Sequence, residues 1–336
     1  GSATASIAEG SYQKELSTVT FDFTEAASND PSATFAILNV ATATLKKSGS
    51  TIASGTLSLS ETVLTATFSD VTLDLNSSYS IEVPAAVVGY AGQVSNDAIT
   101  VNFNTPIFAD GDYYLKNKGN SAYFAGGLSW GTQAITNSIG HIVNLTALPD
   151  GKYTIDSYLY NGGTSSSKHY LADNLYCDGA ATGWSFVADG DYYRINNGTN
   201  NLTAGTVGTA LTLADGTGDD TKWQLLTAAE WKAEQVARLE AATSSNGVDA
   251  TFYIASPNFN RNDDLENAKW QGNPSIAGLD GNGVVCNYNA EKFNTSSFDV
   301  YQDLTGLKPG VYKVTVDGFY RNGTTDDRNA YLYAND

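Results

Sequence analysis

The sequence predicts an all-β protein made of several domains. Three observations support this: residues 5–106 alternate as short strands do, residues 107–226 repeat one unit three times, and residues 227–242 hold the strong helical pattern. A chain of 336 residues is long enough for several domains of ~100–200 residues, each with its own core. We therefore expect domain boundaries near 106, 226 and 247.

Residues 5–106 are predicted to form a β-sandwich. Residues 18–24 alternate cleanly, which places Val19, Phe21 and Phe23 on one face. About six short strands separated by polar turns, within roughly a hundred residues, are typical of sandwiches. The runs "TLKKSGSTI" and "VNFNTP", and the order of the strands around them, resemble bacterial Ig-like domains. That resemblance implies a spacer or a stalk.

Residues 107–226 are predicted to form a β-trefoil. Asp110, Asp150 and Asp189 each begin an Asp-Gly turn, and these three turns lie about forty residues apart. Three similar units, each with about four short strands, close a compact threefold barrel, whereas solenoids add capping repeats. The last matching segments of the three units begin at His141, Trp184 and Trp223.

The first of these units carries the run "DGDYYLKN", followed by "YFAGG" and "WGTQA". These runs resemble ricin-type β-trefoil lectin domains. They are also similar to a module that recurs in surface glycan-utilisation proteins of gut anaerobes. The resemblance implies the trefoil fold and the binding of carbohydrate.

Residues 227–247 are predicted to be a helical connector. Thr227 and Glu230 have the spacing of a capping box, in which each side chain bonds the other's backbone N–H. Trp231, Gln235 and Leu239 then follow at helical spacing. We expect Trp231 to fasten the helix to the trefoil.

Residues 248–336 return to a strand pattern. The run "FDVYQDLTGLKPGVYKVTVDGFYRNG" resembles galactose-binding-like jelly-roll modules, in which a Gln- and Gly-rich hairpin precedes a central strand. Such modules are longer than the segment available, so we expect an incomplete jelly roll or a piece of a longer protein. The matching positions are Gln302, Leu304, Gly306, Leu307, Pro309, Gly310 and Tyr312.

The excess of acidic over basic residues limits the classes of partner that this chain can bind. Lys and Arg number 18 against 36 Asp and Glu, giving a formal net charge of −18. Nucleic acids and anionic membranes attract clustered basic side chains, so both are disfavoured as partners. Only 16% of residues are charged, against ~25% in an average domain, and a surface of Ser, Thr, Asn and Gly is common in extracellular binding proteins.

We expect a secreted or cell-surface protein. No run approaches the ~18 apolar residues of a membrane span, so no transmembrane segment is predicted in this sequence. The chain contains no Met and begins with Gly1-Ser2, which looks like a cloning scar. A targeting segment is therefore expected to be missing from it.

Catalytic and metal-binding motifs are not found in the sequence. The two histidines are His141 and His169; His141 is interpreted as a core substitution, and His169 has no evident partner. A pair of carboxylates would suffice for glycoside hydrolysis, but no acid stands in a recognisable context. We predict no enzyme, no catalytic residue, no metal site and no cofactor, although the oxygen-rich loops 215–220 and 260–264 would suit a structural calcium ion.

The two cysteines, Cys177 and Cys286, lie in different predicted domains. A disulfide needs Cα atoms within ~7 Å of each other, so we predict two isolated thiols rather than a bond.

Sugar binding is the chemistry that the residues support best. Sugars combine apolar C–H faces with hydroxyls, so their sites join a flat aromatic ring to amide, carboxylate or guanidinium groups. Each aromatic candidate could instead pack in a core. The candidates are Trp130, Trp270, Tyr288, Tyr320, Arg321 and Asn322.

Trp130 is the best candidate within the trefoil. When the first unit is aligned with the third, residues 128–130 stand where the third has only Val207. Insertions in trefoils fall in surface loops, where function concentrates. An exposed indole on such a loop could stack on a pyranose face; the alternative is that the loop folds back and buries it.

The predicted function is therefore non-catalytic carbohydrate recognition, with glycans or glycoproteins as partners. Two alternatives remain from other classes. One is an adhesion or structural surface protein that binds no glycan. The other is an accessory region of a glycoside hydrolase whose catalytic domain lies outside this sequence.

Overall fold

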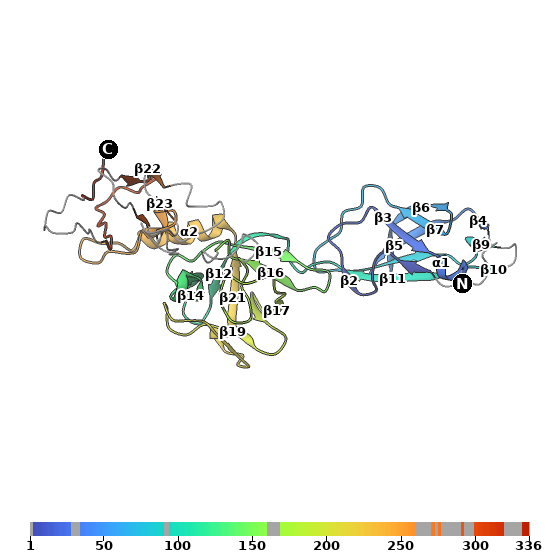
Figure 1. The fold of residues 1–336 in the computed structure, drawn as a ribbon, viewed down its shortest axis with the longest axis horizontal. Helices are drawn as coiled ribbons and strands as arrows, with labels where there is room; N and C mark the ends of the chain where they lie inside the picture. Colours follow the sequence, from blue (N-terminus) through green and yellow to red (C-terminus); the bar gives the residue numbers. More distant parts are fainter. Residues whose placement is uncertain are drawn as a thin grey trace. The chain divides into compact units, whose positions relative to one another are not determined.

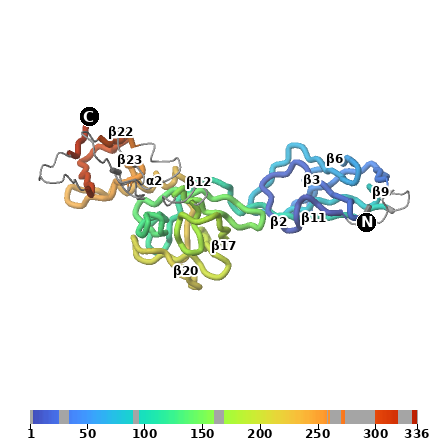
Figure 2. Tube along the Cα trace, in the orientation of Figure 1, coloured from blue at the N-terminus to red at the C-terminus, as the bar shows by residue number. Residues whose placement is uncertain are grey.

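A computed structural model describes residues 3–27, 34–90, 94–159, 169–257, 259, 270–272, 275–276, 290–291, 299–318 and 331–335 (Figure 1). Strands dominate these residues, and their α-helices are α1 (Thr24–Ala27) and α2 (Ala228–Leu239). The chain divides into two compact units, and its path can be followed in Figure 2. The prediction of an all-β multidomain protein is confirmed; the sandwich, trefoil and jelly-roll assignments and the boundaries at 106, 226 and 247 stay predictions.

Unit 1 comprises Gly1–Gly111, Asn144–Ile155 and Gly183–Phe186. Its larger sheet has the strand order β1-β3-β7-β6-β5-β8-β11-β2, and β4, β9 and β10 form a smaller one. The strand bounds are β1 (Thr4–Ala5), β2 (Ser11–Tyr12), β3 (Thr18–Asp22), β4 (Phe35–Ile37), β5 (Thr42–Lys47), β6 (Ser50–Ser60), β7 (Val63–Thr67), β8 (Ser78–Val83), β9 (Val88–Tyr90), β10 (Val94–Ser95) and β11 (Ile99–Asn104).

The alternation read from the sequence accounts for the core of these sheets. Side chains on a strand point alternately to opposite faces, so β3 can bury every second residue. Val19, Phe21 and Phe23 are all buried, as predicted, and they pack in one cluster with Leu45 and Ile81. The intervening threonines of β3 are exposed or half-buried.

Unit 2 comprises Asp112–Val143, Asp156–Thr182 and Val187–Asp336. Its main sheet follows the path β14-β13-β12-β21-β18-β19-β20, which places β21 between β12 and β18. The bounds of the strands from Gly111 to Leu226 are β12 (Gly111–Asn117), β13 (Tyr123–Gly127), β14 (Gln133–Asn137), β15 (Val143–Ala147), β16 (Tyr153–Asp156), β17 (Ser185–Asp189), β18 (Tyr192–Asn196), β19 (Asn201–Thr203), β20 (Thr212–Ala214) and β21 (Lys222–Leu226).

The tryptophans that close the second and third repeats are core residues. Trp184 and Trp223 have no exposed surface, and the indole N–H of Trp223 donates to the Leu202 carbonyl at 2.9 Å. His141 differs from them, because it is only half-buried and its Nε2 lies 2.7 Å from the Ser157 carbonyl oxygen. His141 also lines a cavity.

Helix α2 is fastened as predicted. The ring of Trp231 stacks on that of Tyr114 with centroids 4.2 Å apart and planes 3° apart, and its Nε1 donates to the Ile139 carbonyl at 2.7 Å. An ion pair of 2.8 Å joins Lys116 of β12 to Glu234 of the helix. These contacts pack α2 against β12 and against the segment that follows β14.

The capping box at the start of α2 is confirmed. The Thr227 hydroxyl accepts from the Glu230 N–H at 3.2 Å, and the Glu230 carboxylate accepts from the Thr227 N–H at 2.7 Å. Thr227→Ala removes one of these acceptors and is expected to lower the stability of unit 2 by about 0.5–2 kcal/mol. Thermal unfolding followed by circular dichroism measures the change. Thr227→Ser keeps the acceptor and should stay near wild type; equal losses in both variants would contradict the capping role.

Cys177 carries a free thiol, and no part of its side chain is exposed. Burial raises the pKa of this thiol, so little reactive thiolate forms. We expect an alkylating reagent at pH 8 to spare Cys177 in the folded protein and to modify it after unfolding without reductant. Peptide mass spectrometry measures both states. A Cys177–Cys286 peptide from an unreduced digest would contradict the expectation; Cys286 lies outside the described residues.

The last part of the chain contains four short strands among its described residues. β22 (Gln271–Gly272) pairs with β25 (Val300–Tyr301), and β23 (Ser275–Ile276) pairs with β24 (Ala290–Glu291). Gln302 follows β25 and fixes it to the chain near 255: its Nε2 donates to the Ala255 carbonyl at 2.6 Å, and its Oε1 accepts from the Ala255 N–H at 3.0 Å. The conspicuous glutamine of the sequence motif thus has a structural role.

Candidate functional site

Trp130 lies on the loop between β13 and β14 and is 62% exposed. The loop turns sharply, because Leu128, Trp130 and Gly131 all have positive φ, at 46°, 61° and 70°. The Gly131 N–H donates to the Leu128 carbonyl at 2.9 Å and closes the turn. The prediction that Trp130 stands on an exposed loop is confirmed.

The base of this loop is bonded to the segment 172–178. The Thr132 hydroxyl donates to the Asp178 carboxylate at 2.9 Å, and the Cys177 N–H donates to the Thr132 carbonyl at 2.7 Å. Two residues after Thr132, in β14, the Ala134 N–H donates to the Leu175 carbonyl at 2.8 Å. Two of these bonds join backbone groups and one joins side chains, and together they tie the base of the loop to this segment.

Several non-glycine residues in and around this loop have positive φ, as do others elsewhere in the described chain, such as Ser48 and Glu61. Besides Leu128 and Trp130, Tyr158 and Leu175 also have positive φ, both at 61°. Side chains other than glycine enter this region at a cost of about 1–3 kcal/mol each, and such residues cluster at functional sites. A Cβ added to Gly126, before the loop, would lie 2.3 Å from Leu159 Cδ1, so Gly126 and the residue after Tyr158 are in close contact.

Polar groups lie on the segment that supports the loop. Asp173 and Asn174 are exposed, and Asp178 is half-buried. The Asn174 side chain accepts from the Tyr176 N–H at 3.1 Å, which leaves its amide NH₂ with two donor hydrogens. We call Trp130 together with residues 172–178 the Trp130 surface.

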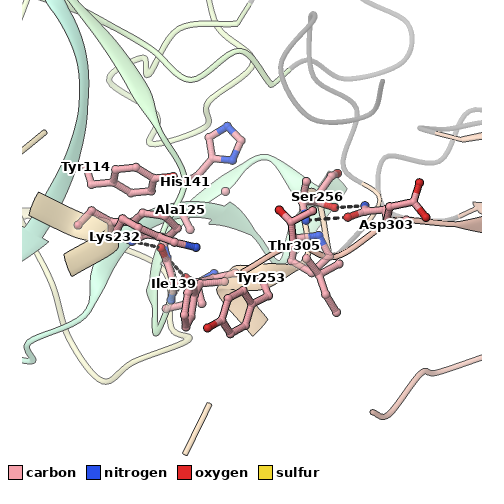
Figure 3. Close-up of a pocket in the computed structure, with 18 of the residues that line it drawn as sticks. Tyr114, Ala125, Ile139, His141, Lys232, Tyr253, Ser256, Asp303 and Thr305 are labelled. Atoms are coloured by element: carbon pink, nitrogen blue, oxygen red, sulfur yellow. Dashed lines mark hydrogen bonds between the residues drawn. The ribbon is translucent and has the colours of Figure 1, made fainter. Parts of the chain in front are cut away.

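A cavity of about 570 Å³ lies elsewhere in unit 2 (Figure 3). Its walls come from the segment 137–141, the start of α2, the segment 252–257 and the residues after β25. The volume falls in the usual range for small-molecule sites. The residues that line it include Asn137, His141, Trp231, Lys232, Phe252, Tyr253, Gln271, Gln302, Asp303 and Thr305.

The polar lining of the cavity is already ordered by internal hydrogen bonds. Asn137 accepts from the Gly140 N–H at 2.6 Å, and the Gln271 amide donates to Asp303 Oδ2 at 2.9 Å. Lys232 lies over the rings of Phe252 and Tyr253, and burial against them lowers the pKa of its ammonium. The cavity therefore combines one cation, one carboxylate and several amides with aromatic rings.

The other aromatic candidate of known position, Trp270, is half-buried. Its Nε1 donates to the Ser256 carbonyl at 3.0 Å, and its ring lies 4.6 Å from that of Phe259. The next residue, Gln271, lines the cavity. Tyr288, Tyr320, Arg321 and Asn322 lie outside the described residues.

The sequence singled out His141, Trp231 and Gln302 for other roles, and it did not predict the cavity that they line. Lys232, Phe252 and Tyr253 carry no local signal, because a lysine on a helix and two aromatics after a turn are common core and surface patterns. What brings them together is the packing of α2 against the turn 251–253, which places the ammonium 4.4 Å from the centre of the Phe252 ring.

His169 has a partner that the sequence did not show. Its Nδ1 lies 2.5 Å from Asp156 Oδ1, and both side chains are largely buried. The neighbouring Ser157 hydroxyl lies 2.8 Å from the His169 carbonyl oxygen and 2.9 Å from that of Cys177, and its one hydrogen is shared between these acceptors. These bonds hold the segment 169–177, and residues 172–177 of it belong to the Trp130 surface.

In the described part of the chain, no group of three or more His, Cys, Asp or Glu side chains is placed to hold a metal ion. In the loop 215–220, Asp219 pairs with Lys118 at 3.0 Å and Lys222 at 3.2 Å, and the two ammonium groups lower the pKa of its carboxyl. The loop 260–264 lies outside the described residues. None of the helices in the described ranges is long and apolar enough to span a membrane.

No protein-family model matches the sequence, and no curated protein matches it. A solved structure of SeviL bound to asialo-GM1 saccharide is similar to part of the chain, with 22% sequence identity. The match covers 36% of this chain and 99% of that chain, with a TM-score of 0.28. A match at this TM-score carries no argument about the fold or the ligand of this chain.

Proposed function

We propose that this protein recognises carbohydrate without transforming it, as a secreted or cell-surface protein that binds glycans or glycoproteins. The observation that carries the proposal is the exposure of Trp130. Its indole is 62% exposed, on a turn whose base is hydrogen-bonded to the segment 172–178. A large exposed aromatic is costly in water, and a sugar's C–H face would cover it.

The polar groups on the segment 172–178, which is hydrogen-bonded to the base of the loop, fit a neutral sugar. Asp173, Asn174 and Asp178 offer carboxylate and amide groups, and these pair with hydroxyls as acceptors and donors. Hydrogen bonds to a carboxylate are stronger than those between neutral groups. The hydrogen bonds at the base of the loop limit the conformations that it can adopt. Ordering the loop would therefore cost a bound ligand little of its binding free energy.

A glycan array probed with the full chain tests the proposal, followed by calorimetric titration of the sugars that bind. We expect saturable binding of neutral glycans, and no release of reducing ends from them. Absence of any saturable glycan binding would refute the proposal. Release of reducing ends that one Asp or Glu substitution abolishes would refute its non-catalytic part.

A further inference from the structure

The cavity of unit 2 contains a cation without a carboxylate partner. The Lys232 ammonium lies 4.4 Å from the ring centre of Phe252 and 4.8 Å from that of Tyr253. No carboxylate among the described residues lies within ion-pair distance of it. Among the described lysines, Lys152 and Lys313 likewise have no ion pair, whereas an acidic partner is found for Lys14, Lys46, Lys47, Lys116, Lys118, Lys222 and Lys308.

The two aromatic rings hold this ammonium in place at the cavity wall. A cation over a ring face is attracted by the ring's quadrupole, and the rings bring no formal negative charge to offset it. The formal net charge of −18 opposes anions in general, so binding of an anionic ligand in this cavity would depend on the local charge of Lys232.

The other end of the cavity offers hydrogen-bond acceptors. Figure 3 shows Lys232 and Asp303 at opposite ends of the view, with Tyr253, Ser256 and Thr305 between them. The Asp303 carboxylate accepts from Gln271 through Oδ2, and a carboxylate has room for several more donors. A ligand that spans the cavity therefore meets a cation first, an aromatic wall next, and acceptors last.

We propose that this cavity is a second ligand site and takes an acidic sugar of the uronic acid class. The sugar's carboxylate would bind the Lys232 ammonium as a charge-assisted pair, and its hydroxyls would bond the amide and carboxylate groups of the lining. A volume of about 570 Å³ accommodates a sugar ring with its bound water. An amino acid fits less well, because its ammonium requires several acceptors around one point. This proposal does not rest on the Trp130 surface.

Calorimetric titration of the full chain with sodium glucuronate and galacturonate at low salt tests the site, with glucose and galactose as neutral counterparts. We expect one saturable site for a uronate, with an affinity about tenfold or more above that of the neutral sugar. Lys232→Gln should remove that preference. Lys313→Gln, at an exposed lysine outside the cavity lining, is the matched control and should bind as wild type.

Three results would overturn the proposal: no saturable uronate binding, equal affinity for uronate and neutral sugar, or equal binding by the two lysine variants. Trp130→Ala separates the two sites. It should leave uronate binding intact, and loss of that binding in Trp130→Ala would place the acidic sugar on the Trp130 surface instead. Failure of the neutral-glycan array leaves these outcomes unaffected.

Discussion

Replacing Trp223 with alanine is expected to destabilise unit 2 by about 3–5 kcal/mol, the usual cost of emptying a fully buried tryptophan site. Trp223 has no exposed surface and lies in β21, which pairs with β12 on one side and β18 on the other. The substitution also leaves the Leu202 carbonyl without the indole donor it now has at 2.9 Å. For a unit of this size the melting temperature should fall by roughly 10 °C or more.

Scanning calorimetry measures this loss, and Trp223→Phe serves as the matched variant. Phenylalanine keeps most of the buried volume but cannot donate to Leu202, so its cost should be about 1–3 kcal/mol, clearly below that of alanine. If Trp223→Ala melted within a degree or two of wild type, the core position of this tryptophan would be wrong.

Replacing Trp130 with alanine is the same chemical change at an exposed position, and we expect the opposite pattern. Affinity for the glycan found on the array should fall about tenfold or more, because the stacking surface is lost. Stability should change by less than about 1 kcal/mol, as is usual for exposed side chains. Titration calorimetry and thermal melts on the same samples measure the two effects.

Val207→Ala is the matched control for Trp130→Ala. Val207 occupies the corresponding place in the third repeat and is also exposed, at 46%. It should bind glycan as wild type. Trp130→Gly adds a second test, since glycine adopts the positive φ of 61° freely and should keep or raise stability while binding is lost. A large loss of stability with unchanged binding in Trp130→Ala would remove Trp130 from the site.

Several features followed from local sequence because they depend on near neighbours in the chain. Alternation placed Val19, Phe21 and Phe23 in one core, since successive strand residues face opposite sides. The three-residue spacing of Thr227 and Glu230 marked the start of α2, since a capping box closes within one helical turn. The two-residue insertion before Gly131 predicted an exposed loop for Trp130, since a packed sheet has no room for added residues.

The cavity and the support of the Trp130 surface were decided by tertiary structure alone. Lys232 faces Phe252 and Tyr253 because α2 packs against a turn some twenty residues later, and Gln302 closes the wall from fifty residues further on. His169 meets Asp156 in the same way, through a fold that no local pattern encodes. Periodicity and capping report the geometry of one strand or one turn, whereas a binding site depends on which distant segments the core brings together. The sequence by itself therefore determined the all-β class, the start of the helix and the exposure of one tryptophan, and the packing of distant segments determined where a ligand could be held.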